Sequence, residues 1–206
     1  GGWCKAAFED KEPEWWNTYS KYFAVSVQGE ASGNISRKKG CLYGAGMVIR
    51  KSHWIELNER GFVPQLHCRK GDTLSSGGDT EYSYALRLLG YKIWFDERLF
   101  FIHCMTKGRM SLDYLSRLRK AMSASNFIVM PYQEVLLSGL ETRNSLIKKA
   151  VKKLQETGFS HLRKRVFGSY EEKELAKEFF RMQKQFLLDY KDYRTVRESI
   201  DLWLKK

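Results

Sequence analysis

Apolar residues recur at helical spacing over residues 80–89, and Gly90 ends the pattern. A stretch rich in serine and glycine at residues 72–78 comes first, so the chain enters this helix from a flexible loop. A second helix is predicted over residues 52–60, with Ser52 as its N-cap and Gly61 after its last turn. From Ser111 onward the pattern is helical almost to the carboxyl end.

Short strands are predicted between these helices. Residues 91–95 and 99–103 are apolar stretches on either side of an Asp-Glu pair, and residues 42–50 join a small-residue turn to a short apolar strand. Residues 1–40 mix aromatic and acidic side chains without sustained periodicity, and we expect them to be partly irregular. The chain therefore divides into a mixed α/β part and a helical tail. Pro131 and Gly139 mark the boundary, which gives domains of residues 1–130 and 131–206.

Composition limits the class of protein. The chain has 206 residues, of which 43% are hydrophobic and only 3 are proline, so it has enough apolar material for a sizeable core and is not a low-complexity chain. No stretch approaches the ~20 apolar residues that cross a bilayer, and the first residues carry no secretory signal. The four cysteines are widely spaced, which favours a reducing, cytoplasmic compartment.

The positive charge is concentrated in the tail. The formal net charge is +12, and residues 141–206 hold 17 basic and 10 acidic side chains, so seven of these charges lie there. Within residues 146–154 the apolar side chains share one helical face and four lysines share the other. Three interpretations of the region 143–165 stay open: a solvated helix docked on the domain, peripheral contact with an anionic membrane, or nucleic-acid binding. Nucleic acid is the least favoured partner, because no nucleic-acid-binding motif accompanies the lysines.

The strongest candidate for chemistry is the sequence GGDTE at residues 77–81, where a flexible loop enters a helix. Asp79 is suited to be the N-cap of this helix, because its carboxylate is able to accept from the first backbone N–H groups. It is equally suited to be a general base, because an ionised carboxylate at the mouth of a loop takes a proton from an incoming hydroxyl. The residues alone leave both roles open.

The surrounding sequence resembles a known family. The stretch SSGGDTEYSYALRLLGYKIWFD at residues 75–96, followed by a strand that ends in His103, resembles the distal half of a family 2 glycosyltransferase of GT-A fold. The stretch YGAGMVIR at residues 43–50 resembles the small-residue segment that comes before the carboxylate in the same family. The resemblance covers about residues 1–120. It implies an α/β fold with a partial GT-A-like mixed sheet of three to five strands and flanking helices, followed by a helical C-terminal tail.

The resemblance also implies roles for individual residues. Asp79 corresponds to the base that deprotonates the acceptor hydroxyl for attack on the anomeric carbon with inversion. His103 corresponds to a ligand of the divalent metal, Mg²⁺ or Mn²⁺, that bridges the donor diphosphate in the complete enzyme. The positions implied to bind substrate are Gly44, Ala45, Gly46, Gly78, Thr80, Glu81 and Trp94.

Each of these assignments has a purely structural alternative that the sequence leaves open. Residues 44–46 also suit a turn at the entry of a strand, and His103 also suits a core position. Glu81 also suits a solvated place in the first helical turn, favoured by the helix dipole. Trp94 also suits ordinary packing along a strand.

One part of the family pattern is missing. The chain contains no D-x-D motif and no alternating strand and helix units before the GGDTE sequence. We therefore expect the chain to be the carboxyl-terminal portion of a longer enzyme that is inactive alone. The expected partners are a nucleotide-sugar donor and a saccharide or lipid-linked acceptor of surface polysaccharide or glycolipid synthesis, at the cytoplasmic face of the membrane. The competing hypotheses are a non-enzymatic basic module that binds anionic membrane or nucleic acid, and a glycosyltransferase remnant without activity.

Overall fold

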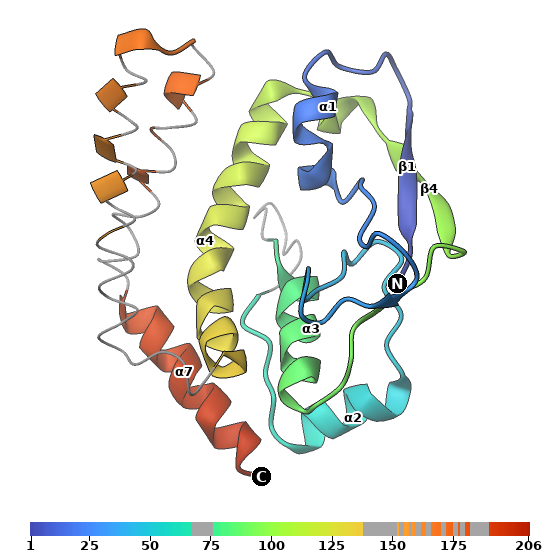
Figure 1. Cartoon of the computed structure of the whole chain (residues 1–206), viewed down its shortest axis with the longest axis vertical. Helices are drawn as coiled ribbons and strands as arrows, with labels where there is room; N and C mark the ends of the chain where they lie inside the picture. The colour runs from blue at the N-terminus through green and yellow to red at the C-terminus, as the bar shows by residue number, and fades with distance from the viewer. Residues whose placement is uncertain are drawn as a thin grey trace.

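The computed structural model describes residues 1–66, 76–137 and 190–206, together with scattered residues between 152 and 181. These residues form two pairs of strands and several helices (Figure 1). Strand β1 (Trp3–Phe8) runs parallel to β4 (Phe100–Met105), with Trp3 opposite Phe100 and Phe8 opposite Met105. Strand β2 (Gly33–Asn34) pairs antiparallel with β3 (Trp94–Phe95). The mixed α/β class is therefore confirmed.

The strands differ from the sequence prediction in two places. Strand β1 lies within the segment that we expected to be partly irregular; its even-numbered side chains Cys4, Ala6 and Phe8 face inward, whereas Lys5 and Ala7 are exposed. The predicted strand at residues 47–50 is wrong, because no strand is formed there.

Helices α2 and α3 follow the prediction closely. Helix α2 (Lys51–Glu59) begins after Arg50, so the predicted N-cap Ser52 lies inside its first turn, and Gly61 follows its last turn as expected. Helix α3 (Gly78–Leu88) begins two residues earlier than the apolar pattern indicates. It is preceded by Gly77, whose φ of +98° lies in the left-handed region that glycine adopts without strain.

Helix α4 (Leu112–Leu136) begins after Ser111, whose Oγ accepts from the backbone N–H of Tyr114 at 3.1 Å. Pro131 lies inside this helix, so the predicted boundary between residues 130 and 131 falls within one continuous element, near its C-terminal end. Helix α7 (Tyr190–Leu204) packs along the second half of α4 (Figure 1).

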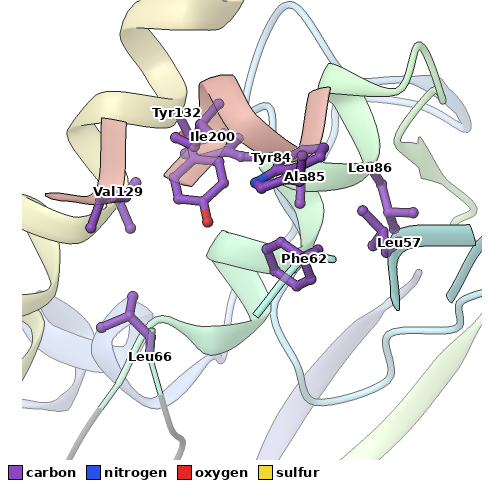
Figure 2. Packing of buried hydrophobic residues seen from close by; sticks show 11 residues of the cluster. Leu57, Phe62, Leu66, Tyr84, Ala85, Leu86, Val129, Tyr132 and Ile200 are labelled. Atoms are coloured by element: carbon purple, nitrogen blue, oxygen red, sulfur yellow. The ribbon is translucent and has the colours of Figure 1, made fainter. Parts of the chain in front are cut away.

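Three buried clusters are formed among the described residues, and the smallest consists of Ile35, Leu42, Ile93 and Phe95. The largest cluster joins α2, α3, α4 and α7, and Figure 2 shows its labelled side chains gathered between these helices. Its buried members are Leu57, Phe62, Leu66, Tyr84, Ala85, Leu86, Val129, Tyr132, Val196, Ile200 and Trp203. The second cluster joins the paired strands β1 and β4 to the first half of α4. It includes aromatic residues of α1 (Trp16–Tyr19) and of the short helix η1 (Ser20–Phe23).

The basic region at residues 143–165 lies mostly outside the described residues. Within the described part of the chain, no helix combines the length and the apolar character that crossing a bilayer requires.

Candidate functional site

Asp79 stands in the first turn of α3 and is held by two backbone groups. Its Oδ2 accepts a hydrogen bond from the N–H of Gly44 at 2.6 Å, and its Oδ1 accepts from the N–H of Thr80 at 2.8 Å. The residue is half-buried. The bond to Thr80 is local, whereas the bond to Gly44 joins two segments that are 35 residues apart in the chain. Asp79 therefore fastens the turn at residues 44–46 to the start of α3.

This turn is packed too closely for larger side chains. A Cβ atom on Gly44 would lie 3.2 Å from the Asp79 Cβ and 3.3 Å from its Oδ2. A Cβ atom on Gly46 would lie 2.5 Å from the Phe101 ring, and Gly46 has a φ of +75°. The structure thus brings two sequence-predicted positions, Asp79 and the small-residue turn, into direct contact. The turn lies between the start of α3 and strand β4.

His103 lies on the same strand as Phe101. The two are separated by one residue, so their side chains leave the same face of β4, and their ring centroids are 6.3 Å apart. Gly46 of the turn packs against Phe101, so His103 lies two residues further along the strand that borders the turn. No group of three His, Cys, Asp or Glu side chains able to hold a metal ion exists among the described residues.

Glu81 occupies a different environment from Asp79, although only one residue separates them. Its side chain is fully buried, and its carboxylate accepts from the backbone N–H groups of Gln65 and Leu66 at 2.8–3.1 Å and from the Tyr132 hydroxyl at 2.8 Å. The interpretation of Glu81 as a solvated first-turn glutamate is wrong, because the chain before α3 and helix α4 enclose it. Burial and the neighbouring Glu81 carboxylate together raise the pKa of Tyr132 above its usual range.

Trp94 is 55% exposed and borders a cavity of about 340 Å³. Residues 47–50 and 91–94 line most of this cavity, together with Leu42 and Ser83. Asp79 does not line it, so the structure does not place Trp94 and Asp79 in one cavity. Of the remaining predicted positions, Gly78 is buried at the start of α3, and Ala45 is half-buried in the turn.

The sequence interpretation missed a lysine beside Asp79. Lys39 Nζ donates to Gln28 Oε1 at 2.8 Å and lies 3.3 Å from the centroid of the Tyr43 ring. Gln28 is itself buried and fixed, because its Oε1 also accepts from the N–H of Tyr43 at 2.7 Å and its Nε2 donates to the carbonyl oxygen of Gly2 at 2.5 Å. The one available signal was the position of this lysine four residues before the tyrosine of YGAG.

Burial dominates the electrostatics of this group of side chains. It lowers the pKa of Lys39 to about 8, and the nearby Cys41 and Asp79 oppose this shift in part. Burial raises the pKa of the Cys41 thiol and of the Tyr43 hydroxyl. Asp79 adds to the raised pKa of both, so its carboxylate lies within electrostatic reach of all three side chains.

Comparisons of the chain with models of protein families, with curated proteins and with solved structures found no match. The assignment of a function therefore depends on the arrangement of Asp79, the small-residue turn and strand β4.

Proposed function

We propose that the chain carries the acceptor side of an inverting glycosyltransferase of GT-A-like fold, with Asp79 as the general base. The reaction would transfer a sugar from a nucleotide-sugar to a hydroxyl group of a saccharide or lipid-linked acceptor. The observation that carries the proposal is the bond from Gly44 N–H to Asp79 Oδ2 at 2.6 Å, which joins the carboxylate to the small-residue turn.

This arrangement suits proton abstraction. Each carboxylate oxygen of Asp79 accepts one backbone N–H, which fixes the orientation of the group. Oδ1 also accepts from the Thr80 hydroxyl at 3.5 Å, so Oδ2 is the oxygen that would take the proton of an acceptor hydroxyl. Gly44 and Gly46 are themselves exposed, so the turn beside Asp79 is open to solvent. A general base requires this combination of fixed direction and open access.

The proposed chemical step involves only the two substrates and Asp79. The carboxylate takes the proton of the acceptor hydroxyl as the hydroxyl oxygen attacks the anomeric carbon. The bond from this carbon to the phosphate oxygen breaks on the opposite side, and its electron pair leaves with the nucleoside diphosphate. Attack from the side opposite the leaving group inverts the configuration.

The proposal also includes a divalent ion, a location at the membrane and a contact between Trp94 and the acceptor. When bound, the Mg²⁺ or Mn²⁺ ion would neutralise charge on the departing diphosphate, and His103 is the residue of this chain that the resemblance implies as a ligand. The enzyme would work at the cytoplasmic face of the membrane, with peripheral contact through residues 143–165. Trp94 would offer its exposed indole to the acceptor, since aromatic faces suit the C–H surfaces of sugars.

The test replaces Asp79 in the complete enzyme and compares it with a matched aspartate. Asp113 also lies in the first turn of a helix, α4, but is exposed and paired with Arg117 at 2.9 Å. We expect Asp79→Asn to reduce transfer at least about a hundredfold, the lower range for loss of a general base, with nucleotide affinity unchanged. We expect Asp113→Asn to keep full activity. Full transfer by Asp79→Asn, or loss of nucleotide binding together with activity, would overturn the base role.

A calorimetric titration tests whether the donor site lies outside this chain. The 206-residue chain is titrated with UDP, GDP, dTDP and CMP, each in the presence of Mn²⁺. We expect no binding, because the chain has no D-x-D motif to hold the metal and the diphosphate. Micromolar binding of any one nucleotide would show that the chain builds its own donor pocket, and it would contradict the acceptor-side assignment.

A further inference from the structure

Lys39 is a half-buried cation whose described contacts are all with neutral groups. Its Nζ donates to the amide oxygen of Gln28 and lies over the Tyr43 ring. None of the ion pairs formed among the described residues includes it. The neighbouring Lys38, by contrast, is exposed and pairs with Glu30 at 2.8 Å. Removing an ammonium group from water is costly, and the nearby Cys41 and Asp79 offset this cost only in part.

The position of this ammonium group is fixed before any ligand arrives. Gln28 is 5% exposed, and its side-chain amide is bound at both ends to the backbone, at Tyr43 and at Gly2. The aromatic face beneath Nζ adds a second restraint. A cation held by buried partners loses little conformational freedom on binding, which is the property of a prepared anion-binding position.

The same contacts place Lys39 beside the proposed base. Tyr43, on which the ammonium group rests, is followed directly by Gly44, whose N–H binds Asp79. The Asp79 carboxylate lies within electrostatic reach of the Lys39 ammonium group, which places a cation and a carboxylate near each other. A substrate that presents a hydroxyl to Asp79 and an anionic group to Lys39 would satisfy both.

We propose that Lys39 binds an anionic group, a carboxylate or a phosphate, on the acceptor whose hydroxyl Asp79 deprotonates. This inference rests on the proposed function and adds the substrate class: an acidic sugar or a phosphorylated acceptor in place of a neutral one. Lys39 acts here as a specificity-determining residue, because its contact selects the acceptor and takes no part in the proton transfer.

The proposal predicts an unusual pH dependence. The titratable and charged groups facing Lys39 are Asp79, Cys41 and Tyr43, with Arg87 close to Cys41. Because burial lowers the pKa of Lys39 to about 8, its charge is lost well below the usual lysine range. Anion binding would therefore weaken about thirtyfold between pH 7 and pH 9.5, as the charged fraction of Lys39 falls.

The experiment measures binding of three probes to the 206-residue chain by NMR titration: glucuronate, glucose 6-phosphate and neutral glucose. Both anions keep a nearly constant charge from pH 7 upward, since a phosphate monoester has its second pKa at about 6. We expect one or both anions to bind at pH 7 more tightly than glucose, and the stronger of the two identifies the carboxylate or the phosphate as the group recognised.

Three variants separate the lysine from general charge. Lys39→Met should lower the affinity for the anion at least about tenfold, as expected for loss of a charge-assisted hydrogen bond. Lys39→Arg should retain binding at pH 9.5, and Lys38→Met should change nothing. Thermal unfolding of each variant checks that it folds. Equal anion binding by folded Lys39→Met, or binding by the parent chain that does not change with pH, would overturn the proposal.

Failure of this inference differs from failure of the proposed function. If Lys39→Met binds anions as the parent does while Asp79→Asn abolishes transfer, Asp79 is the base and Lys39 does not bind the anion. If Asp79→Asn keeps full transfer while Lys39→Met loses the anion, the site binds an anion but is not the acceptor site of this reaction.

Discussion

Tyr132 on α4 donates a hydrogen bond to the buried carboxylate of Glu81 on α3, with 2.8 Å between the two oxygen atoms. The same carboxylate accepts from the backbone N–H groups of Gln65 and Leu66. Glu81 thus ties three separate segments together within the larger helical core. Asp79 lies two residues before it on α3, so this buried network fixes the start of the helix that presents the proposed base.

Tyr132→Phe removes the hydroxyl from this network. We expect the free energy of unfolding to fall by about 1.5–3 kcal/mol, the range for a hydrogen bond to a charged group. Tyr84→Phe is the matched control, because the Tyr84 hydroxyl accepts only a neutral bond from Gln133 Nε2 at 3.0 Å. This variant should lose about 0.5–1.5 kcal/mol. Urea unfolding of both proteins gives the comparison, and equal losses would mean that the charge of Glu81 adds nothing to the bond.

Gly46→Ala tests whether the small-residue turn is structurally required. Alanine in the left-handed region costs about 1–2 kcal/mol, and the new Cβ atom would in addition lie 2.5 Å from the Phe101 ring. Gly108→Ala is the control, since no atom lies within 4 Å of the corresponding Cβ position. We expect a clear drop in melting temperature for Gly46→Ala alone. An unchanged melting temperature would show that the turn adapts to a side chain.

Helix α3 was predictable because its signals are local. The apolar spacing over residues 80–89 and the glycines at both ends are properties of one short segment, and helix formation depends mainly on neighbours within a few residues. Strand β1 was not predictable in the same way. It pairs in parallel with β4, almost a hundred positions later, and its own sequence has only a weak alternation of apolar and polar residues.

The candidate site was only partly predictable for the same reason. Asp79 and the turn at residues 44–46 were singled out through a resemblance, and their contact is visible only in the fold. Glu81 fits the sequence pattern of a solvated first-turn acid, and the hydroxyl that helps to bury it comes from Tyr132, 51 residues away. Lys39 gave only a weak sequence signal, its position four residues before Tyr43, because its environment is made by Gln28 and Tyr43 from other parts of the same loop region.

The lowered pKa of Lys39 makes a prediction about stability. Its pKa is about 8 in the folded protein and about 10.5 when unperturbed, so the unfolded chain binds more protons between these two pH values. The contribution of Lys39 to the free energy of unfolding should therefore rise from pH 8 to pH 10.5. The charged form destabilises the fold below pH 8, and this cost disappears above pH 10.5. Other groups also titrate in this window, so the informative quantity is a difference between proteins.

That difference compares the parent chain with two lysine variants. Urea unfolding is measured at several pH values for the parent, Lys39→Met and Lys38→Met. We expect the unfolding free energy of the parent to increase relative to that of Lys39→Met as the pH rises. The difference between the parent and Lys38→Met should not change with pH, because Lys38 is exposed. A constant difference between the parent and Lys39→Met would show that the pKa of Lys39 is close to its ordinary value.

Substitution of the two carboxylates of α3 should affect different properties: Glu81 the stability of the fold and Asp79 the transfer activity. Glu81→Gln replaces a fully buried carboxylate by an amide that has one acceptor oxygen instead of two. At least one of the donors that now bind Glu81, the N–H groups of Gln65 and Leu66 and the Tyr132 hydroxyl, then loses its acceptor or has to accept from the new amide. We expect a loss of about 2–4 kcal/mol in the free energy of unfolding, because buried donors are left unsatisfied.

Asp79→Asn should behave in the opposite way. Asp79 is half-buried, and the amide oxygen of asparagine is able to accept the Gly44 N–H in place of Oδ2. Asparagine has one acceptor oxygen, so the local bond from the Thr80 N–H is lost. We expect the unfolding free energy to fall by about 0.5–1.5 kcal/mol, the range for one hydrogen bond. A small change in stability together with loss of transfer in the complete enzyme would show that Asp79 acts in the reaction, whereas Glu81 stabilises the fold. The N-cap of α3 is Gly77, so the N-cap role that the sequence position of Asp79 suits is wrong. A large loss of stability in Asp79→Asn would instead mark Asp79 as a residue that stabilises the fold through its bond to the Gly44 N–H.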